Sequence, residues 1–421
     1  MIRIAIDANE ANVAHRVGSN TYAFALLQEL YKLTAKRKIE ISVLLSSKKM
    51  TDLPAARHNW RYVYVTPRKL WTQWALPIHL FLHQKDYDVF FTFSHYAPRI
   101  SPIPYLSCVM DLAFLDYPKQ FRQNDRLQLT AWTKYSVKKA RKIITISKFS
   151  KAEITKHYGR QSKDILVAYP ACHFPQSAEP NRSRQFLQKK GIKQPYFLYL
   201  GTLQPRKNIV GLIAAYEELL RKIAAHNLSA KRSRSEIVAD GHRAAAKSER
   251  NSIVADGLRA AVKGRKQKRL VAPQLVIAGK IGWLAEPILA RVKQSVAKEQ
   301  IILTDFVADE HKKALYQGAL ASLLLSFYEG FGIPPLESMS VGTLPIVSNN
   351  SSLPEVVGAA GLLVDPRSSH QISDAMFEVL SAAPLKRQKW QTAMRRQSKK
   401  FSWANSAKTI LDHLEGVARD H

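Results

Sequence analysis

The chain has 421 residues, enough for two domains of ordinary size, and 46% of them are hydrophobic, so it can bury substantial cores. Its 64 lysines and arginines against 33 acids give a net charge of +31, which attracts nucleic acid, phospholipid surfaces or phosphorylated substrates without choosing among them. No apolar run is long enough to span a membrane and the first residues lack signal-peptide anatomy, so we expect a cytosolic protein whose two cysteines, Cys108 and Cys172, are buried free thiols.

Short apolar runs typical of strands alternate with helical stretches along the chain. They occur in residues 1–170 ("RIAIDA", "EISVLL", "DVFFTF", "YLSCVM", "KIITIS", "DILVAY") and again in residues 196–366 ("YFLYLGT", "QLVIAGK", "QIILTDF", "ASLLLSF", "TLPIVSN", "GLLVDP"). Strand–helix alternation with apolar strands predicts parallel sheets covered on both faces. We therefore expect an α/β protein with two Rossmann-like, doubly wound domains facing each other across a cleft, at 1–180 and 190–400. Residues 401–421 should form a helix that packs back on the first domain.

The first loop and the first domain offer candidate binding residues. Gly18 precedes a helix beginning near Asn20, and a glycine there lets a phosphate approach the backbone. The stretch "RKLWTQWALPIHLFLHQ" (68–84) mixes Trp71 and Trp74 with Arg68 and Lys69. It is either a core helix beside the cleft or a segment that docks on an anionic bilayer.

Two residues that follow strands of the first domain could face the cleft. Asp111 follows "YLSCVM" and either contacts a ligand or caps a helix. His95 ends the run in "TFSHYAP", where a packed, hydrogen-bonded histidine is the interpretation that we favour over one facing a ligand.

The second domain carries two cations beside a helix start and one unusual insertion. In "YLGTLQPRKNIVGLIAAY", Arg206 and Lys207 precede a helix N-terminus, which predicts a diphosphate site, although two solvated charges on a basic protein would look the same. From about 229 to 269 the chain is basic, and "EIVADGHRAAAK" returns sixteen residues later as "SIVADGLRAAVK". We interpret this as a disordered or loosely helical insertion, with an anion- or membrane-binding appendage as the alternative.

The stretch "SFYEGFGIPPLESMSVG" contains two glutamates eight residues apart around a rigid bend. An apolar strand precedes it, so Glu329 should lie at the carboxyl end of that strand and Glu337 in the first turn of the next helix, where doubly wound sheets bind ligands. A carboxylate can accept hydrogen bonds from two neighbouring sugar hydroxyls. Stabilisation of the helix dipole is the alternative for Glu337.

Together these stretches resemble the family 4 retaining glycosyltransferases, which have the GT-B fold. The resemblance is strongest over Asp305–Pro366, which includes the Glu-x7-Glu element of that family, and it extends to "GTLQPRKN", "TISKFSKAEI" and "FSW". It covers nearly the whole chain except the insertion. It implies that the C-terminal domain binds a UDP- or GDP-linked sugar as substrate, with no further cofactor, and that the N-terminal domain holds a glycan or lipid-linked acceptor.

The resemblance also implies roles for individual residues. Glu337 would bind the ribose hydroxyls, Glu329 the hydroxyls of the donor sugar, and Lys207 the diphosphate. The same bend and the first loop would supply the remaining donor contacts, from the backbone amides of Phe331, Gly332 and Ile333 and from Gly18. The family often has an arginine where this chain has Thr202, and Arg206 is a substitute for it.

Two features depart from the family or suggest a metal. The family often has His-Asp where this chain has Met110-Asp111, which leaves Asp111 as a catalytic or acceptor-contacting candidate without the neighbouring imidazole. Asp86-x-Asp88 resembles a metal-binding pair of other sugar transferases, but a solvated strand start is the interpretation that we favour, so we expect no metal site.

The sequence therefore predicts a hexosyltransferase, mannosyl- or glucosyl-, of polysaccharide or glycolipid biosynthesis. We expect it to be independent of metals, to lie at the inner face of the membrane, and to have no nucleic-acid partner. A nucleotide-sugar epimerase or a phosphorylase of the same fold remains an alternative, as does a basic nucleic-acid-binding protein, although no zinc-finger, basic-zipper or RNA-binding signature is present.

Overall fold

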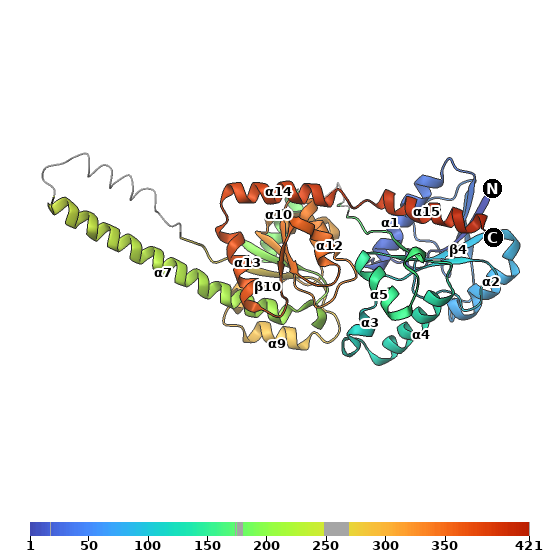
Figure 1. Ribbon diagram of the computed structural model, residues 1–421, viewed down its shortest axis with the longest axis horizontal. Coiled ribbons are helices and arrows are strands. Elements are labelled where there is room, and N and C mark those ends of the chain that lie inside the picture. The colour runs from blue at the N-terminus through green and yellow to red at the C-terminus, as the bar shows by residue number, and fades with distance from the viewer. Residues whose placement is uncertain (17, 173, 175–179, 248–268, 421) are drawn as a thin grey trace.

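The computed structural model describes residues 1–16, 18–172, 174, 180–247 and 269–420. Two α/β domains lie side by side, and each is built around one parallel sheet (Figure 1). The expected pair of doubly wound, Rossmann-like domains is therefore confirmed.

The N-terminal sheet has seven strands in the order β3-β2-β1-β4-β5-β6-β7, and each neighbouring pair is parallel. Its strands are largely apolar because helices cover both faces, so both rows of side chains are removed from water. In chain order the strands are Ile2–Asp7 (β1), Ile39–Leu45 (β2), Trp60–Tyr64 (β3), Val89–Thr92 (β4), Tyr105–Cys108 (β5), Lys142–Thr145 (β6) and Ile165–Val167 (β7).

Helices pack on both faces of this sheet. The first, α1, lies on one face, and α2, α4 and α5 pack through a separate apolar cluster on the other. A π-helical turn, Trp71–Ala75, leads into α2. The helices are Ser19–Thr34 (α1), Leu76–Leu82 (α2), Ala113–Asp116 (α3), Gln123–Lys139 (α4) and Lys148–Tyr158 (α5).

The C-terminal sheet has six parallel strands in the order β10-β9-β8-β11-β12-β13. The strand order reverses between β8 and β11, which is the position where doubly wound sheets bind ligands. The strands are Tyr196–Leu200 (β8), Gln274–Ala278 (β9), Ile301–Leu303 (β10), Ala321–Leu324 (β11), Leu344–Ser348 (β12) and Leu362–Val364 (β13).

The helices of this domain also form two layers. One layer includes α6 and α10, which share an apolar cluster with β8 and β9, and the other includes α7, α9 and α13. The helices are Pro180–Lys189 (α6), Ile209–Lys247 (α7), Glu286–Gln294 (α9), Asp309–Gly318 (α10), Ile333–Ser340 (α11), Leu353–Val357 (α12), Ser369–Ser381 (α13), Pro384–Ser398 (α14) and Trp403–Arg419 (α15).

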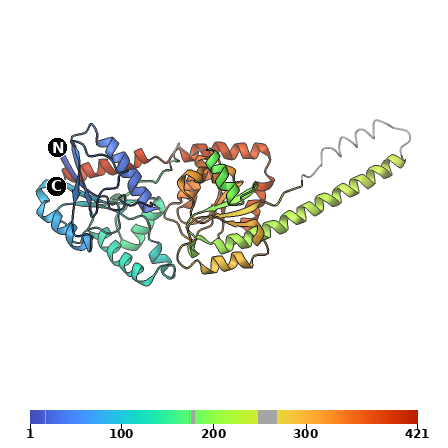
Figure 2. The same cartoon turned by 180° about the vertical axis from the view of Figure 1, so that it is seen from behind.

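The chain crosses between the domains twice. The first crossing joins β7 to α6, and the second joins α14 to α15, which lies on the N-terminal domain beside α1, β1 and β4 (Figures 1 and 2). The two crossings touch, because Ser406 Oγ donates to Tyr169 O at 2.6 Å and the rings of Tyr169 and Phe401 meet edge-on at 5.5 Å.

The predicted insertion begins as a continuation of a core helix. Helix α7 packs on the sheet through its first turns and then projects away from the domain as far as Lys247 (Figures 1 and 2). The second copy of the sequence repeat, at 252–263, lies outside the described residues. Two hydrogen bonds join the chain before the insertion to the chain after it. Asn227 Nδ2 donates to Leu270 O and Leu270 N donates to Asn227 Oδ1, both at 2.9 Å.

Cys108 is a buried free thiol, and Cys172 is a half-buried one. Burial raises the pKa of both thiols, which suits a structural role more than a reactive one. In the described parts of the chain, every helix is too short or too polar to cross a bilayer.

Candidate functional site

The bend between β11 and α11 carries the two glutamates. The backbone amide of Glu329 donates to Ser351 Oγ at 3.1 Å, and Ser352 Oγ donates to the carbonyl oxygens of Glu329 and Phe331 at 2.8 and 2.7 Å. Gly332 adopts a φ of 111°, a conformation that residues with a side chain rarely adopt. The bend is therefore held by the two serines that precede α12.

The helix begins one residue earlier than the prolines suggest, and this corrects the expected position of Glu337. Helix α11 starts at Ile333, so Pro334 and Pro335 lie in its first turn, as expected, but Glu337 is the fifth helical residue and lies in the second turn. No acid occupies the first turn of α11. Stabilisation of the helix dipole therefore accounts poorly for Glu337, because the interaction of a charge with the dipole weakens beyond the first turn.

A buried ion pair links this bend to the loop after β8. Lys207 Nζ lies 2.5 Å from Glu329 Oε1, and the two side chains are only 14% and 10% exposed. Ser326 Oγ also donates to Glu329 Oε1 at 2.6 Å. The backbone of Arg206 accepts a hydrogen bond from Phe327 N at 2.8 Å, so the cationic loop and the glutamate loop are tied together.

The charges of this cluster act on one another. Burial alone would raise the pKa of Glu329, but the charges of Lys207 and Arg206, with hydrogen bonds from Lys207 and Ser326, hold it below its ordinary value. Burial holds the pKa of Lys207 below its ordinary value, and the charges of Glu329 and Asp111 oppose that shift. Glu329 is thus an ionised carboxylate at neutral pH.

Arg206 adds a second cation with free hydrogen-bonding capacity. Its Nε is buried, and no acceptor for it exists among the residues that the structure describes. Its charge lowers the pKa of both Glu329 and Lys207, which places it beside the pair. An anion entering here would meet one unpaired and one paired cation.

Glu337 makes a separate contact. Its Oε2 accepts a hydrogen bond from the hydroxyl of Tyr316 at 2.9 Å, which leaves the other carboxylate oxygen for a ligand. Burial raises the pKa of Glu337, although the charge of Lys312 and the bond from Tyr316 oppose that rise. The two glutamates therefore have different partners and opposite pKa shifts.

The start of α11 presents backbone donors. Within the described chain, the amides of Phe331, Gly332 and Ile333 take part in none of the hydrogen bonds, so they remain available to an acceptor outside the protein. Such donors at a helix N-terminus favour negatively charged or polar oxygen ligands.

The N-terminal domain meets this bend closely at Asp111. A Cβ added to Gly330 would lie 2.7 Å from the Cβ of Asp111 and 3.1 Å from Met110 O, so only glycine fits there. Asp111 Oδ1 accepts a hydrogen bond from Ala113 N at 3.0 Å, a local contact at the start of α3. This hydrogen bond supports the interpretation of Asp111 as a helix cap. The other carboxylate oxygen, Oδ2, lies on the side of Gly330.

Helix α5 also docks on the C-terminal domain. Ser147 Oγ and Ser150 Oγ donate to Gly330 O at 2.7 and 3.2 Å. The carboxylate of Glu355 accepts from Lys148 N at 2.9 and 3.0 Å. Residues that follow the carboxyl ends of strands in both sheets therefore meet at one junction, and Glu329 and Lys207 lie in it.

His95 is packed and hydrogen-bonded, as the favoured interpretation of the sequence had it. Its Nδ1 lies 3.2 Å from Thr133 Oγ1, and Met110 N donates to its Nε2 at 3.4 Å. Because Nε2 accepts, the ring is neutral with its proton on Nδ1. Burial lowers the pKa of His95, and the charge of the nearby Asp111 opposes this shift.

Gly18 lies at the start of α1 with a φ of 51°, and a Cβ added there would meet no atom within 4 Å. The carboxylate of Glu10 lies beside the first residues of α1: Glu10 Oε2 accepts from Asn20 Nδ2 at 2.7 Å and from Ser19 Oγ at 3.3 Å. No described hydrogen bond or ion pair connects Gly18 with Lys207 or Glu329, so its contact with a diphosphate stays a prediction.

The Asp-x-Asp pair is used inside the fold. Asp88 forms an ion pair with Arg3 at 2.5 Å, and Asp86 lies 2.9 Å from His83. Both carboxylates therefore have partners at the start of β4.

A carboxylate–imidazole cluster that the sequence did not indicate lies elsewhere. The ligand atoms of Asp116, Glu153 and His157 fall within 4.8 Å of one another, with His157 Nε2 at 3.3 and 3.2 Å from the two carboxylates. Lys156 Nζ lies 3.3 Å from Glu153 and competes with any cation. The three side chains therefore already contact one another and Lys156.

Sequence reasoning missed the residues that hold the site in place. Ser326 lies within the quoted motif, where a serine three residues before Glu329 could have suggested the hydrogen bond that it makes. The sequence around Tyr316 and Glu355 does not indicate their contacts, because these residues reach the site from α10 and α12.

Part of the chain is similar in sequence to known glycosyltransferases. Residues 254–397 match the family described as glycosyl transferases group 1. The O-antigen chain mannosyltransferase B of Escherichia coli is 31% identical over 283 residues, which cover 64% of this chain and 59% of that one. A GDP-mannose-dependent alpha-(1-6)-phosphatidylinositol dimannoside mannosyltransferase of Mycobacterium tuberculosis is 31% identical over 150 residues, or 35% and 37% of the two chains. The chain thus spans about three-fifths or less of these relatives.

The fold is also that of solved proteins. A sucrose-phosphate synthase from Thermosynechococcus elongatus superposes with a TM-score of 0.68 at 16% identity, covering 100% of both chains. Likeness at this identity identifies the architecture alone, and that architecture is the expected GT-B fold.

Proposed function

We propose that this protein is a glycosyltransferase that moves a hexose from a nucleoside-diphosphate sugar to a glycan or lipid-linked acceptor. The observation that carries the proposal is the buried Lys207–Glu329 pair, with Arg206 beside it, at the junction between the carboxyl edges of two doubly wound sheets. Sheets of this kind bind their ligands at that edge.

The charges suit the departure of a nucleoside diphosphate. Breaking the anomeric bond leaves extra negative charge on the diphosphate, and fixed cations and helix amides aimed at it lower the barrier. Lys207, Arg206 and the amides at the start of α11 supply such groups. Glu329 and Glu337 are then left to accept hydrogen bonds from the hydroxyls of the donor sugar and of the ribose.

The reaction is proposed to retain the anomeric configuration. The acceptor would attack on the face from which the diphosphate leaves, with an oxygen of the diphosphate taking the acceptor proton. We propose that Asp111, which lies against Gly330 from the N-terminal side, contacts the acceptor. Because Lys207 and Arg206 already provide positive charge, we propose that turnover needs neither a metal nor another cofactor.

The relatives make mannose the first sugar to test. Both relatives named above are mannosyltransferases, and one is GDP-mannose-dependent. We propose GDP-mannose as the donor, with UDP-linked hexoses as the next candidates, and a role in building a bacterial-type polysaccharide or glycolipid.

The test is donor binding followed by turnover. Calorimetry with GDP, GDP-mannose, UDP and UDP-glucose should detect binding of one nucleotide series, and NMR of the product on a mannoside acceptor should show the anomeric configuration of the donor. Lys207→Met should abolish binding of the diphosphate. Absence of binding to every nucleotide tested, together with tight and salt-sensitive binding to an oligonucleotide, would overturn the proposal in favour of a nucleic-acid-binding protein.

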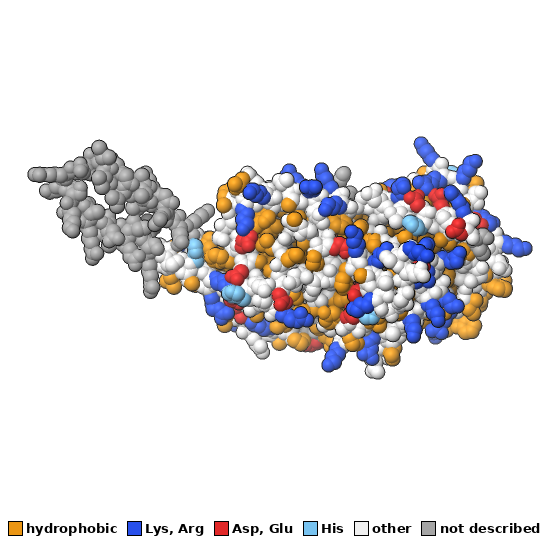
Figure 3. Space-filling view, viewed as in Figure 1, with side chains coloured by type: hydrophobic (Ala, Val, Ile, Leu, Met, Phe, Trp, Pro, Cys, Tyr) orange, Lys and Arg blue, Asp and Glu red, His pale blue; other side chains and the backbone are white. Residues whose placement is uncertain are grey.

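We further propose that the protein associates peripherally with an anionic membrane at its cytoplasmic face. Helix α2 buries Leu76 and Leu80, whereas the opposite side of the helix and the turn before it expose Trp74, Ile78 and Phe81 by half or more. Figure 3 shows hydrophobic side chains on the surface at the end of the molecule where α2 lies, with lysine and arginine side chains near them. An apolar strip on a basic protein suits an anionic lipid surface.

Vesicle sedimentation tests the association. Wild-type protein should bind vesicles that contain anionic lipid and should bind less as salt rises, and Trp74→Ser should weaken the salt-resistant part. Equal binding to neutral and anionic vesicles, or no binding at low salt, would exclude this surface as an anionic-membrane contact.

A further inference from the structure

The side chain of Tyr328 extends from the C-terminal domain into the N-terminal one. The residue directly precedes Glu329 in the bend after β11, and it is only 3% exposed. Its ring meets those of Tyr117 and Phe149, which belong to the N-terminal domain, edge-on at 5.7 and 5.3 Å. Its hydroxyl oxygen accepts a hydrogen bond from Leu112 N at 3.2 Å. A buried contact between the domains therefore lies next to Glu329 in the chain.

Tyr117 makes a contact in the opposite direction. Its hydroxyl donates to Phe327 O in the C-terminal domain at 3.0 Å. The amide of Phe327 in turn donates to Arg206 O at 2.8 Å, so Phe327 links the cationic loop to the N-terminal domain. Each of the two tyrosines thus binds the backbone of the other domain through its hydroxyl, and their rings touch. We call Tyr117 and Tyr328 the tyrosine pair.

The N-terminal side of this contact is the segment 111–120, which follows β5. It begins at Asp111, which lies against Gly330 and directly precedes Leu112. At its other end, Gln120 O accepts a hydrogen bond at 2.8 Å from Nε1 of Trp283, which lies between β9 and α9. The C-terminal domain therefore contacts the segment at both ends and, through the tyrosine pair, in its middle.

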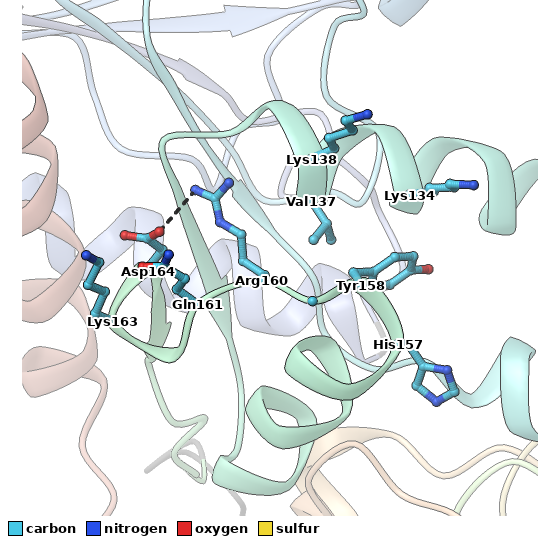
Figure 4. Close-up of a pocket in the computed structure, with 10 residues that line it drawn as sticks. Lys134, Val137, Lys138, His157, Tyr158, Arg160, Gln161, Lys163 and Asp164 are labelled. Atoms are coloured by element: carbon cyan, nitrogen blue, oxygen red, sulfur yellow. Dashed lines mark ion pairs between the residues drawn. The ribbon is translucent and has the colours of Figure 1, made fainter.

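The surface that receives Tyr328 is anchored within the N-terminal domain. Phe149 lies in the first turn of α5, and the chain just after this helix is tied to the rest of its own domain. Arg160 Nη2 donates there to Ala140 O at 2.8 Å, and the guanidinium group pairs with Asp164 at 3.8 Å, beside a pocket of about 650 Å³ (Figure 4). We therefore expect loss of the contact at Tyr328 to change the relation of the two domains more than the position of α5.

Packing alone would also give a buried tyrosine a partner for its hydroxyl, so the position of the partner matters. Tyr196, for example, donates to Leu315 O at 2.7 Å, and both residues belong to the C-terminal domain. The tyrosine pair differs because both of its backbone partners lie across the domain boundary. Those partners lie within two residues of Asp111 and Glu329, so the contact bears directly on the candidate site.

We propose that Tyr328, together with Tyr117, is a positioning residue that holds Asp111 beside the bend that carries Glu329. The inference rests on the proposed function, in which Asp111 belongs to the acceptor side and Glu329 to the donor side of one reaction. Tyr328 acts through the backbone of Leu112 and of its own neighbour, not through contact with a substrate. Without its hydroxyl, the amide of Leu112 loses its acceptor when the domains meet, which disfavours that arrangement. Donor binding within the C-terminal domain should persist, whereas transfer to the acceptor should slow.

Kinetics and calorimetry test the assignment with the nucleotide sugar that the wild type binds, GDP-mannose first, and a mannoside acceptor. Tyr328→Phe should lower kcat about tenfold and leave the Kd and KM of the donor unchanged. Tyr117→Phe should act in the same direction. Tyr196→Phe is the matched control, because it also removes one buried hydroxyl bonded to a backbone carbonyl, and it should leave kcat unchanged. Equal kcat values in Tyr328→Phe and Tyr196→Phe, or a loss of donor affinity in Tyr328→Phe, would overturn the proposal.

Small-angle X-ray scattering tests the domain contact without turnover. The variant Tyr328→Phe/Tyr117→Phe should have a larger radius of gyration than the wild type, and Tyr196→Phe should not. An unchanged radius in the double variant would overturn the inference even if the protein transfers a hexose. A larger radius in a protein that binds no nucleotide sugar would confirm the domain contact, but it would refute the proposed function and the positioning role with it.

Discussion

Replacing Lys207 with methionine should destabilise the C-terminal domain because it leaves Glu329 as a buried charge without its main partner. Removing one member of a buried ion pair costs about 3–5 kcal/mol. The two side chains are 14% and 10% exposed, and Arg206 and Ser326 still act on Glu329, so the lower end, about 3 kcal/mol, is expected.

The double variant Lys207→Met/Glu329→Gln removes both charges and should recover much of this loss. The coupling free energy from the four-variant cycle should be about 2 kcal/mol, within the range found for residues in contact. Urea unfolding followed by circular dichroism measures it. Donor binding should be lost in both single variants and in the double variant. The double variant should therefore regain stability without regaining donor binding.

An exposed pair provides the control. Lys408 forms an ion pair with Asp412 on α15 at 2.9 Å, with side chains 61% and 43% exposed. Lys408→Met should therefore change the free energy of unfolding by less than about 1 kcal/mol. If Lys207→Met costs no more than Lys408→Met, the reasoning about burial of the pair is wrong.

The stability of the wild type should also depend on pH through Glu329. Because the pKa of this carboxyl is below its ordinary value in the folded protein, its contribution is present above the unfolded pKa and is lost as the pH falls through the folded pKa. The Glu329→Gln variant should lack this component of acid destabilisation. An unchanged acid profile in the variant would show that other carboxylates account for it.

Four further outcomes are expected. Glu337→Ala should keep the fold but weaken donor binding by about 1–3 kcal/mol, since ribose hydroxyls lose their acceptor; wild-type affinity in calorimetry would contradict this. Gly330→Ala should reduce turnover and enlarge the particle in solution scattering, because its Cβ would meet Asp111 at 2.7 Å; unchanged kinetics would refute the close contact. EDTA should leave turnover intact, and deletion of 229–269 with a short linker should leave donor affinity intact, because Asn227 and Leu270 already close the base. A reversible loss in EDTA, or an insoluble deletion protein, would contradict these expectations.

The fold was accessible from the sequence because its signal is local. Strands such as "ASLLL" are apolar on both faces, and this requires a sheet covered by helices on each side. Lys207 and Glu329 could be assigned to one edge because each follows such a strand. The ion pair between them could not, because it depends on how two loops 122 residues apart come together.

The errors and omissions have local causes too. The start of α11 was placed too late because Gly332, with its positive φ, allows the helix to begin at Ile333 ahead of the prolines. The segment with Trp74 could not be assigned from composition, since it has one buried and one exposed side.

The two crossings between the domains adjoin each other and form one joint. Because the two crossings contact each other through Ser406 and Tyr169, we expect any opening of the domains to bend the chain at this joint. Phe331 belongs to this joint, because its ring lies 5.5 Å from that of Phe401 and 6.2 Å from that of Tyr169. The bend that carries the amides of Phe331, Gly332 and Ile333 therefore lies against this joint. We expect a movement of the domains to change the position of those amides.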